Sequence, residues 1–257
     1  MKKYIPLFCL TGLCAGQLLT AQTQFNIDFN TAGDFGSNND SGWNVYAAPV
    51  DVDGSTLITS TDAASSITLS QSGVIADSTA GNLSVGASRP SWVVSDAGND
   101  FFFTDTSGVN ESFTLTFGGM TAGNNISLDI YACRTSTAAV DGTYEYSLDG
   151  GSTWFGFDVL TNAGSLETAD GWDGVDTKSQ TFDISSDGYD NGRYMNISDV
   201  TLTGSTLLIR VTEANVSGAY VGVNAMRLTV IPESSTYASI LGLAGICSAV
   251  FLKRKRR

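Results

Sequence analysis

Alternation of apolar and polar residues over short stretches is the feature that most limits how this chain folds. In "SFTLTF" (112–117) every second residue is apolar, and "NISLDIYA" (125–132) repeats the pattern with Ile126, Leu128 and Ile130. A period of two residues is that of a strand with one buried face. No stretch shows a sustained helical period, and turn-forming residues, including 28 glycines, fill the gaps. We therefore expect an all-β chain.

Further strand candidates run along the chain: "FNIDF", "WNVYA", "SITLS", "WVV", "FFFT", "TYEYSL", "WFGFDV", "QTFDI", "TLLIRVTE" and "AMRLTV". The loop "GGMTAGNN" joins the first two stretches, so residues 112–132 are predicted to form a hairpin. Many short strands with frequent turns indicate a sandwich or a barrel. No internal repeat of solenoid or propeller length is present. We predict one domain over residues 22–230, a two-sheet antiparallel sandwich with jelly-roll-like connections.

The predicted domain is strongly acidic. The chain has 26 Asp and Glu against 13 Lys and Arg. All acidic residues but Glu233 and only six of the basic ones lie within residues 22–230, so 25 minus 6 gives a net charge near −19. Such a surface repels phosphate backbones, so nucleic acid is not an expected partner. Cations and neutral polymers such as polysaccharides fit this charge better.

The chain has no histidine, which excludes histidine general bases, Ser-His-Asp triads and imidazole metal sites. Of the four cysteines, Cys9, Cys14 and Cys247 lie in the terminal segments, so no disulfide is expected within the domain. The remaining cysteine, Cys133, lacks a histidine partner and is interpreted as a packed thiol.

The N-terminal segment "MKKYIPLFCLTGLCAGQLLTAQTQ" has a basic start, an apolar run and a small residue before a polar one. This layout is typical of a secretory signal peptide. We predict that signal peptidase removes residues 1–21 by cutting between Ala21 and Gln22. An uncleaved anchor helix is the alternative, although glycines and a glutamine interrupt the apolar run.

The C-terminal segment has an uncharged stretch, Tyr237–Leu252, followed by five basic residues, Lys253, Arg254, Lys255, Arg256 and Arg257. At about 1.5 Å per residue this stretch reaches about 24 Å, a little short of a hydrocarbon core of about 30 Å. A basic cluster stays on the cytoplasmic side, which places the domain outside, as a signal peptide also requires. We predict a transmembrane helix over 237–252. A buried core helix is the alternative, and it leaves the basic residues unexplained.

The whole tail, "IPESSTYASILGLAGICSAVFLKRKRR" (231–257), resembles a PEP-CTERM sorting signal. Such signals combine a Pro-Glu-Pro-like motif, a short transmembrane helix and an arginine-rich end, in Gram-negative bacteria that make extracellular polysaccharide. Pro232 and Glu233 match the first two motif positions, and Ser234 stands where the family has its second proline. The resemblance implies recognition by an exosortase, a membrane transpeptidase. This enzyme would cut near Pro232–Glu233 and pass the domain from the inner membrane to the cell surface or the extracellular matrix.

One turn motif stands out inside the domain. "SLDGGSTW" fits the pattern Ser-x-Asp-x-Gly-x-Thr-Trp, with Ser147, Asp149, Gly151, Thr153 and Trp154. It resembles the Asp-box, a structural hairpin turn of sialidase-type propellers. The aspartate is expected to accept bonds from the turn's own amides, the glycines allow positive φ, and the tryptophan is expected to fold under the turn. The single copy predicts a hairpin between "TYEYSL" and "WFGFDV" and not a sialidase.

Ligand-binding candidates come from polar turns. No cofactor is required, but calcium is a candidate because carboxylates are closely spaced in "DVDGST" and "ADGWDGVD", at Asp51, Asp53, Asp170, Asp173 and Asp176. Ordinary turn chemistry is the competing interpretation. Trp172 and Tyr189 lie in polar loops and are candidates to stack a sugar ring, or else they fold back onto the core. Trp43, Trp92 and Trp154 lie in apolar contexts and are interpreted as core.

Enzymatic function has weaker support. A glycosidase needs two carboxylates at a fixed separation, and Glu145 and Glu213 on predicted strands form the candidate pair. The competing interpretation places both on the solvated face. The sequence thus favours an exported, non-catalytic, structural or adhesive protein associated with extracellular polysaccharide. Two alternatives stay open: a secreted polysaccharide-active enzyme that uses only Asp and Glu, and a calcium-stabilised surface scaffold.

Overall fold

The computed structural model describes residues 22–30, 41–47, 54–73, 76–77, 90–93, 102–104, 111–132, 141–161, 181–183, 193–213 and 221–232. Contacts divide the chain into two units, one formed by Thr23–Val230 and the other by Met1–Gln22 with Ile231–Arg257. The predicted signal peptide and transmembrane helix lie outside the described residues. In the parts that are described, no helix is long and apolar enough to cross a membrane.

All regular structure within the described residues is β-strand. The strands are β1 (Thr23–Asn30), β2 (Trp43–Ala47), β3 (Ser55–Ile58), β4 (Ala64–Gly73), β5 (Ala76–Asp77), β6 (Phe102–Phe103), β7 (Ser112–Gly118), β8 (Asn125–Tyr131), β9 (Asp141–Ser147), β10 (Phe155–Gly156), β11 (Asp158–Thr161), β12 (Thr181–Asp183), β13 (Arg193–Thr201), β14 (Leu207–Glu213), β15 (Gly222–Val223) and β16 (Ala225–Ile231).

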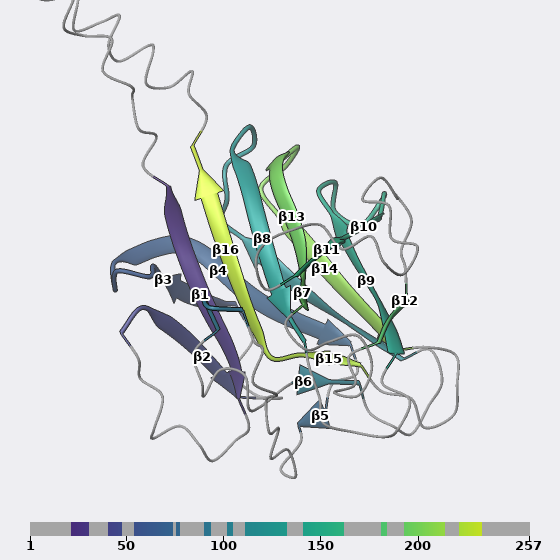
Figure 1. The fold of residues 1–257 in the computed structure, drawn as a ribbon. Coiled ribbons are helices and arrows are strands. Elements are labelled where there is room, and N and C mark those ends of the chain that lie inside the picture. Colours follow the sequence, from purple (N-terminus) through teal and green to yellow (C-terminus); the bar gives the residue numbers. More distant parts are fainter. Residues whose placement is uncertain are drawn as a thin grey trace, which may run out of the picture. The chain divides into compact units, whose positions relative to one another are not determined.

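The strands form two main sheets and one small sheet (Figure 1). The six-stranded sheet has the order β11-β13-β8-β16-β1-β2. The seven-stranded sheet has the order β10-β9-β14-β7-β4-β3, and β12 also pairs with β9. The small sheet has the order β15-β6-β5. The prediction of an all-β, two-sheet sandwich is confirmed. It is not purely antiparallel, because β1 and β2 pair in parallel. The jelly-roll-like connection pattern stays a prediction.

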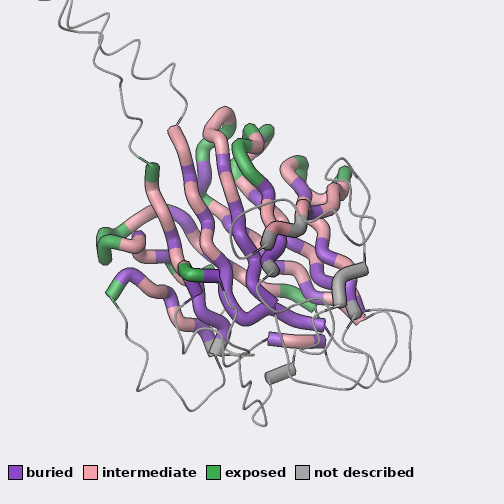
Figure 2. Tube along the Cα trace, viewed as in Figure 1, coloured by how far each residue is buried: buried purple, intermediate pink, exposed green. Residues whose placement is uncertain are grey.

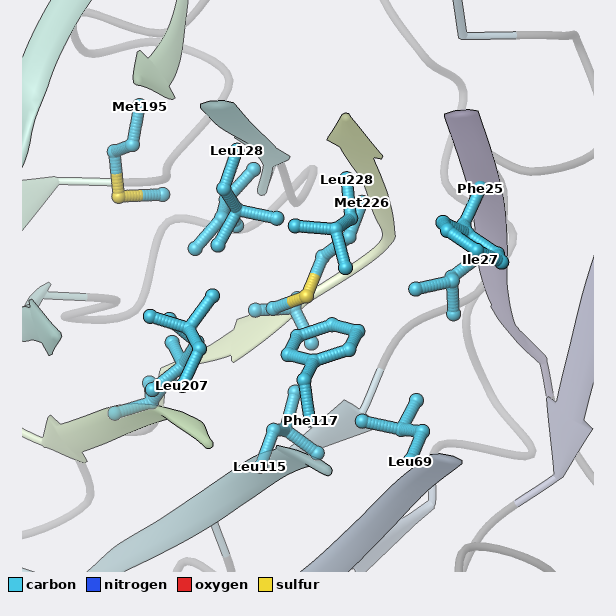
Figure 3. Close-up of a cluster of buried hydrophobic side chains, with 14 of the residues drawn as sticks. Phe25, Ile27, Leu69, Leu115, Phe117, Leu128, Met195, Leu207, Met226 and Leu228 are labelled. Carbon is cyan, nitrogen blue, oxygen red and sulfur yellow. The ribbon is translucent and has the colours of Figure 1, made fainter. Parts of the chain in front are cut away.

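The core lies between the two main sheets. Each long strand turns every second residue inward, as the alternation of burial along the strands shows (Figure 2). Both sheets contribute to one cluster of buried side chains, among them Phe25, Leu128 and Met226 from one sheet and Leu69, Phe117 and Leu207 from the other (Figure 3). Full burial of a Leu or Phe side chain contributes about 1.5–3 kcal/mol. This two-sided core is therefore what holds the sheets face to face.

The predicted hairpin over residues 112–132 is wrong, because β7 and β8 belong to different sheets. The link between them is bonded to the loop that follows β13. Met120 N donates to Ser205 O at 3.2 Å, and Gly123 N donates to Leu202 O at 2.9 Å. A period of two residues indicates that one face of a strand is buried, but it does not identify the neighbouring strand. Two strands that face each other across the core satisfy that pattern as well as two neighbours in one sheet.

Two other strand predictions need correction. Trp92 and Val93 of "WVV" lie in a turn in which Val93 N donates to Pro90 O at 3.0 Å. The stretch "WFGFDV" divides between the sheets, because β10 pairs with β9 and β11 pairs with β13. Phe157 stands between these two strands and is buried in the core. The chain thus crosses from one sheet to the other within a few residues.

The edge strands β2 and β3 are joined across the sandwich by one side chain, Asn44. Its Nδ2 donates to Ile58 O at 2.8 Å and its Oδ1 accepts from Ile58 N at 2.8 Å. The same Nδ2 lies 3.0 Å from Asn26 O on β1. The amide group therefore occupies the place of a backbone unit and connects the six-stranded sheet to the seven-stranded sheet.

Candidate functional site

Part of the outer face of the six-stranded sheet is covered, around Tyr131, Tyr194 and Ala225. Tyr131, Tyr194 and Ala225 point away from the main core, yet they are 1%, 8% and 0% exposed and form a second cluster with Val93. Trp43, Trp92 and Leu160 pack against this cluster. The part of the face that is buried in this way acts as a satellite core, and it offers little surface to a polymer.

Polar side chains on the covered part of this face form hydrogen bonds and an ion pair with one another. Arg227 donates through Nε to Asp129 Oδ2 at 2.8 Å, and Asn196 Nδ2 donates to Asp129 Oδ1 at 2.7 Å. The guanidinium carbon of Arg227 lies 5.0 Å from the centre of the Trp92 ring. The pKa of the Tyr194 hydroxyl is raised by burial, and Asp129 adds to the effect. We assign this set, Trp92, Asp129, Tyr194 and Arg227, a role in stability and call it the covered cluster.

The outer face of the seven-stranded sheet is open and polar. Its outward residues are half-buried or exposed, and most of them carry hydroxyl groups. The register aligns them in rows across the strands, because Ser72 pairs with Thr114, Thr114 pairs with Arg210, and Arg210 pairs with Glu145. We call this surface the open face, defined by Ser70, Ser72, Thr114, Thr116, Thr143, Glu145, Leu208, Arg210 and Thr212.

The Asp-box-like turn joins β9 to β10 at one border of the open face. Phe155 pairs with Tyr146, so the predicted hairpin is present. Asp149 Oδ1 accepts from Thr153 N at 2.9 Å and from Ser147 Oγ at 2.8 Å, while Ser147 Oγ accepts from Gly151 N at 2.9 Å. These bonds, with the Thr153 backbone amide first, lower the pKa of Asp149 to about 2. The turn is thus fixed by its own side chains.

The turn brings Trp154 onto the open face. The guanidinium carbon of Arg210 lies 4.0 Å from the centre of the Trp154 ring. A Cβ atom placed on Gly151 would lie 3.5 Å from Trp154 Cζ2 and 3.8 Å from Leu208 Cδ2, so both side chains lie close to this glycine. Gly151 has φ of +92°, which side-chain-bearing residues rarely adopt. Trp154 is half-buried, and the prediction that it belongs to the core is wrong.

Arg210 and Glu145 form the charged part of this site. Arg210 donates through Nε and Nη2 to Glu145 Oε2 at 2.8 and 2.5 Å, and their side chains are 35% and 13% exposed. A guanidinium group has five N–H donors and a carboxylate has two acceptor oxygens, so the pair presents both donors and acceptors. We call Glu145, Trp154 and Arg210 the Trp154 cluster. It combines an aromatic surface with charged donors and acceptors beside rows of hydroxyl groups.

The structure separates the candidate catalytic pair. Glu145 points outward and pairs with Arg210, whereas Glu213 points inward and is 2% exposed. The two carboxylates therefore lie on opposite faces of the seven-stranded sheet and do not flank one substrate. The competing interpretation, in which both lie on the solvated face, is wrong for Glu213. The stretch "TLLIRVTE" already indicated the inward direction of Glu213. Residue 213 falls on the same face of the strand as Leu207, Ile209 and Val211, because alternate residues share a face.

Some of the other site residues predicted from the sequence are described by the structure, and most of them lie outside the described ranges. Gln22 is exposed before β1, and Pro232 is half-buried after β16. Trp43 and Trp92 are half-buried against the satellite core. Within the described segments no three Asp, Glu, Cys or His residues gather as a metal site. Predicted sites at the following residues lie outside the described ranges: Ala21, Asp51, Asp53, Cys133, Asp170, Trp172, Asp173, Asp176, Tyr189, Glu233, Ser234, Lys253, Arg254, Lys255, Arg256 and Arg257.

Sequence reasoning missed the Trp154 cluster because its members come from distant positions. The turn pattern identified Trp154, and the strand patterns placed Glu145 and Arg210 on strands. The sequence does not show which strands are neighbours in a sheet, so the contact between Trp154 and Arg210 could not be predicted from it. The alternation along each strand did indicate that Glu145 and Arg210 point outward, because both alternate with residues that face the core.

Comparisons with known proteins give only a distant structural likeness. No protein-family model matches the chain, and no curated protein sequence matches it. A CBM35 from Cellvibrio japonicus Abf62 matches 63% of this chain and 94% of its own, at 13% identity and a TM-score of 0.29. A CBM61 solved with β-1,4-galactotriose matches 62% of this chain and 86% of its own, at 13% identity and a TM-score of 0.30.

A third match is the enzymatically active domain of tailspike protein 4 from bacteriophage CBA120. It covers 65% of this chain but 19% of the phage protein, at 14% identity and a TM-score of 0.27. Scores and identities this low assign neither a fold family nor a ligand. The sorting-signal resemblance stays a prediction from the tail's own residues, and the chain is distantly similar in structure to carbohydrate-binding modules.

Proposed function

We propose that this protein is an exported, non-catalytic glycan-binding protein and that the open face around the Trp154 cluster is its contact surface. The observation that supports the proposal most directly is the position of Trp154. A turn fixed by its own hydrogen bonds holds a half-exposed indole against Arg210 and Glu145 on a polar sheet face. Sugar rings present C–H groups to aromatic surfaces and hydroxyl groups to charged and polar partners.

The shape and charge of the open face favour a neutral polymer. Rows of side chains cross four strands, from Ser72 through Thr114 and Arg210 to Glu145. Neighbouring strands are about 4.8 Å apart, so such a row spans about 14 Å. That length suits a chain of several sugars better than a single one. The acidic domain disfavours strongly anionic polymers, because its net charge is near −19 with 25 acidic and six basic residues.

The terminal segments complete the proposal. Residues 1–21 would direct export, and residues 231–257 would act as a PEP-CTERM-like sorting signal that an exosortase cuts near Pro232–Glu233. The last strand, β16, ends at Ile231, so a cut after Pro232 would leave every described strand in the released domain. The protein would then reach the cell surface or the extracellular matrix, where polysaccharide is the expected partner.

The glycan proposal is tested with the full-length chain on an array of polysaccharides and oligosaccharides. We expect wild type to bind at least one neutral polymer and Trp154→Ala to lose about 30-fold in affinity, the effect of removing a central tryptophan contact of about 2 kcal/mol. Trp92→Phe is the matched control, because Trp92 also lies under an arginine but belongs to the covered cluster. We expect this variant to bind as wild type does.

Two results would contradict the proposal. One is a wild-type chain that binds no glycan and is absent from the cell's polysaccharide fraction. The other is a Trp154→Ala variant that keeps the wild-type melting temperature and also keeps the wild-type affinity. Release of reducing sugars by the wild-type chain would show instead that the protein is an enzyme.

A further inference from the structure

The Asp-box-like turn is fixed in shape by its own bonds, but these bonds do not set its tilt relative to the sheet. The bonds of Ser147 and Asp149 join residues of the turn to one another. The strand that follows the turn, β10, has two residues and stands at the end of the strand order. An edge strand is paired on one side only. The tilt of the turn, and with it the position of Trp154, therefore depends on a further contact.

That contact comes from the loop between β13 and β14, residues 202–206. Thr203 Oγ1 donates to Leu148 O at 2.6 Å, and Leu148 is the first residue after β9. A Cβ atom placed on Gly204 would lie 3.7 Å from the same oxygen, so the backbone of the loop also lies close to the turn. The loop and the turn lie at the same end of the sandwich (Figure 1). Thr203 thus holds the start of the turn from outside it.

The β13–β14 loop is itself held in place near both of its ends. Leu202 is 1% exposed and belongs to the main core, and its carbonyl oxygen accepts from Gly123 N at 2.9 Å. Ser205 O accepts from Met120 N at 3.2 Å, and Met120 is buried. Both bonds connect the loop to the link between β7 and β8. The hydroxyl group of Thr203 therefore has a fixed support from which to hold the turn.

The turn transmits this support to the indole. Asp149, which follows Leu148, accepts from Thr153 N at 2.9 Å, and Thr153 directly precedes Trp154. The ring centre of Trp154 lies 4.0 Å from the guanidinium carbon of Arg210. This attraction is lost when the cation moves away from the face of the ring. A turn that tilts away from the sheet would therefore remove the indole from the charged part of the site.

We propose that Thr203 is a positioning residue for the glycan site, and that its bond to Leu148 keeps the Trp154 indole over Arg210. The inference rests on the proposed function of the open face, and the role of Thr203 requires no contact with the sugar. It also connects the site to both sheets, because the loop that carries Thr203 joins β13 of the six-stranded sheet to β14 of the seven-stranded sheet.

The position of the indole is tested without a ligand by fluorine NMR of the full-length chain labelled with fluorotryptophan. The chain has four tryptophans, and Trp154→Phe identifies the resonance of Trp154. Thr203→Val keeps the size of the side chain but loses the donor. We expect it to shift or broaden the Trp154 resonance and to leave those of Trp43 and Trp92 unchanged. Thr203→Ser keeps the hydroxyl group and should restore the wild-type spectrum.

The matched control is Thr201→Val, because Thr201 is exposed and its Oγ1 donates to Asn125 Oδ1 at 2.7 Å, away from the turn. We expect Thr203→Val to lose about fivefold in affinity for a polymer that wild type binds, the effect of one neutral hydrogen bond. Thr201→Val and Thr203→Ser should bind as wild type does. In a Trp154→Ala background, Thr203→Val should cause no further loss of affinity, because both changes act through the same ring.

Two results would overturn the proposal. One is a Trp154 resonance that stays unchanged in Thr203→Val. The other is an equal change of this resonance in Thr201→Val, which would show a general effect of losing a surface bond. A wild-type chain that binds no glycan would contradict the proposed function, whereas the resonance of Trp154 would still decide whether Thr203 positions the indole.

Discussion

The hydroxyl group of Ser147 links the Asp-box-like turn to the end of β9. It donates to Asp149 and accepts from the amide of Gly151, and the residue has no exposed surface. Asp149 in turn accepts from the amide of Thr153, which fixes the chain just before Trp154. The position of the indole on the open face therefore depends on the short polar side chains that fix the turn.

The Asp149 carboxylate gives a pH-dependent prediction. Its pKa is lowered from 3.8 to about 2 by bonds from Thr153 and Ser147. Because the folded pKa is below the unfolded one, its contribution to stability is complete above pH 4 and is lost as the pH falls from about 4 to about 2. We expect the difference in melting temperature between wild type and Asp149→Asn to shrink over this range. Carboxyl carbon NMR of Asp149 should show a midpoint near pH 2, and a midpoint near 4 would contradict the bonding described.

The residue scale also shows what the sequence could reveal about the site. The turn pattern was sufficient to predict the bonds of Asp149, because donors and acceptor are within a few residues of one another. The contact between Trp154 and Arg210 was not predictable, because it depends on β14 lying beside β9. Hydrogen bonds between residues close in sequence can be predicted from the sequence. A contact between a ring and a neighbouring strand can be predicted only when the order of the strands is known.

At the scale of elements, β9 depends on a close approach between two segments. Gly142 lies under Val221, and a Cβ atom on this glycine would come within 2.1 Å of Val221 Cγ2. Val221 has no exposed surface and cannot move out into solvent. The glycine at this point of β9 therefore serves the packing of the sandwich and not a turn.

Substitution of Gly142 tests this packing. We expect Gly142→Ala to lower the free energy of unfolding by about 1–3 kcal/mol, the usual cost of overpacking. In Gly142→Ala/Val221→Ala the clash is removed, so the double variant should be more stable than the sum of the single effects predicts, by about 1 kcal/mol. Urea unfolding of the four chains measures the coupling. Strict additivity would show that the two side chains do not compete for this space.

The elements themselves were largely predictable, and their partners were not. Alternation correctly located β7, β8, β14 and β16, since each has a buried and a polar face. It failed for the pairing of β7 with β8, because the core lies between these strands and both still bury one face. It failed again at Phe157, where one apolar stretch feeds strands of two sheets. Periodicity reports burial, whereas the sheet that a strand joins is decided by contacts distant in sequence.

At the scale of the whole molecule, the proposed sorting signal predicts a processed C-terminus. Mass spectrometry of the protein isolated from its native cells should find a chain that begins at Gln22 and ends near Pro232. Replacement of Pro232 and Glu233 by alanine should leave the full tail through Arg257 and keep the protein with the membrane fraction. A native protein that retains Arg257 would contradict the sorting proposal and would leave the glycan proposal untouched.

The bond between Asn44 and Ile58 has a consequence for how copies of this protein behave when they are crowded. An open strand edge is a template on which another chain can add a strand. Asn44 uses its amide to join the two edge strands β2 and β3, so the backbone groups of Ile58 are already occupied. The substitution Asn44→Leu would leave those backbone groups without this bond. We expect the variant to self-associate under conditions in which it is still folded.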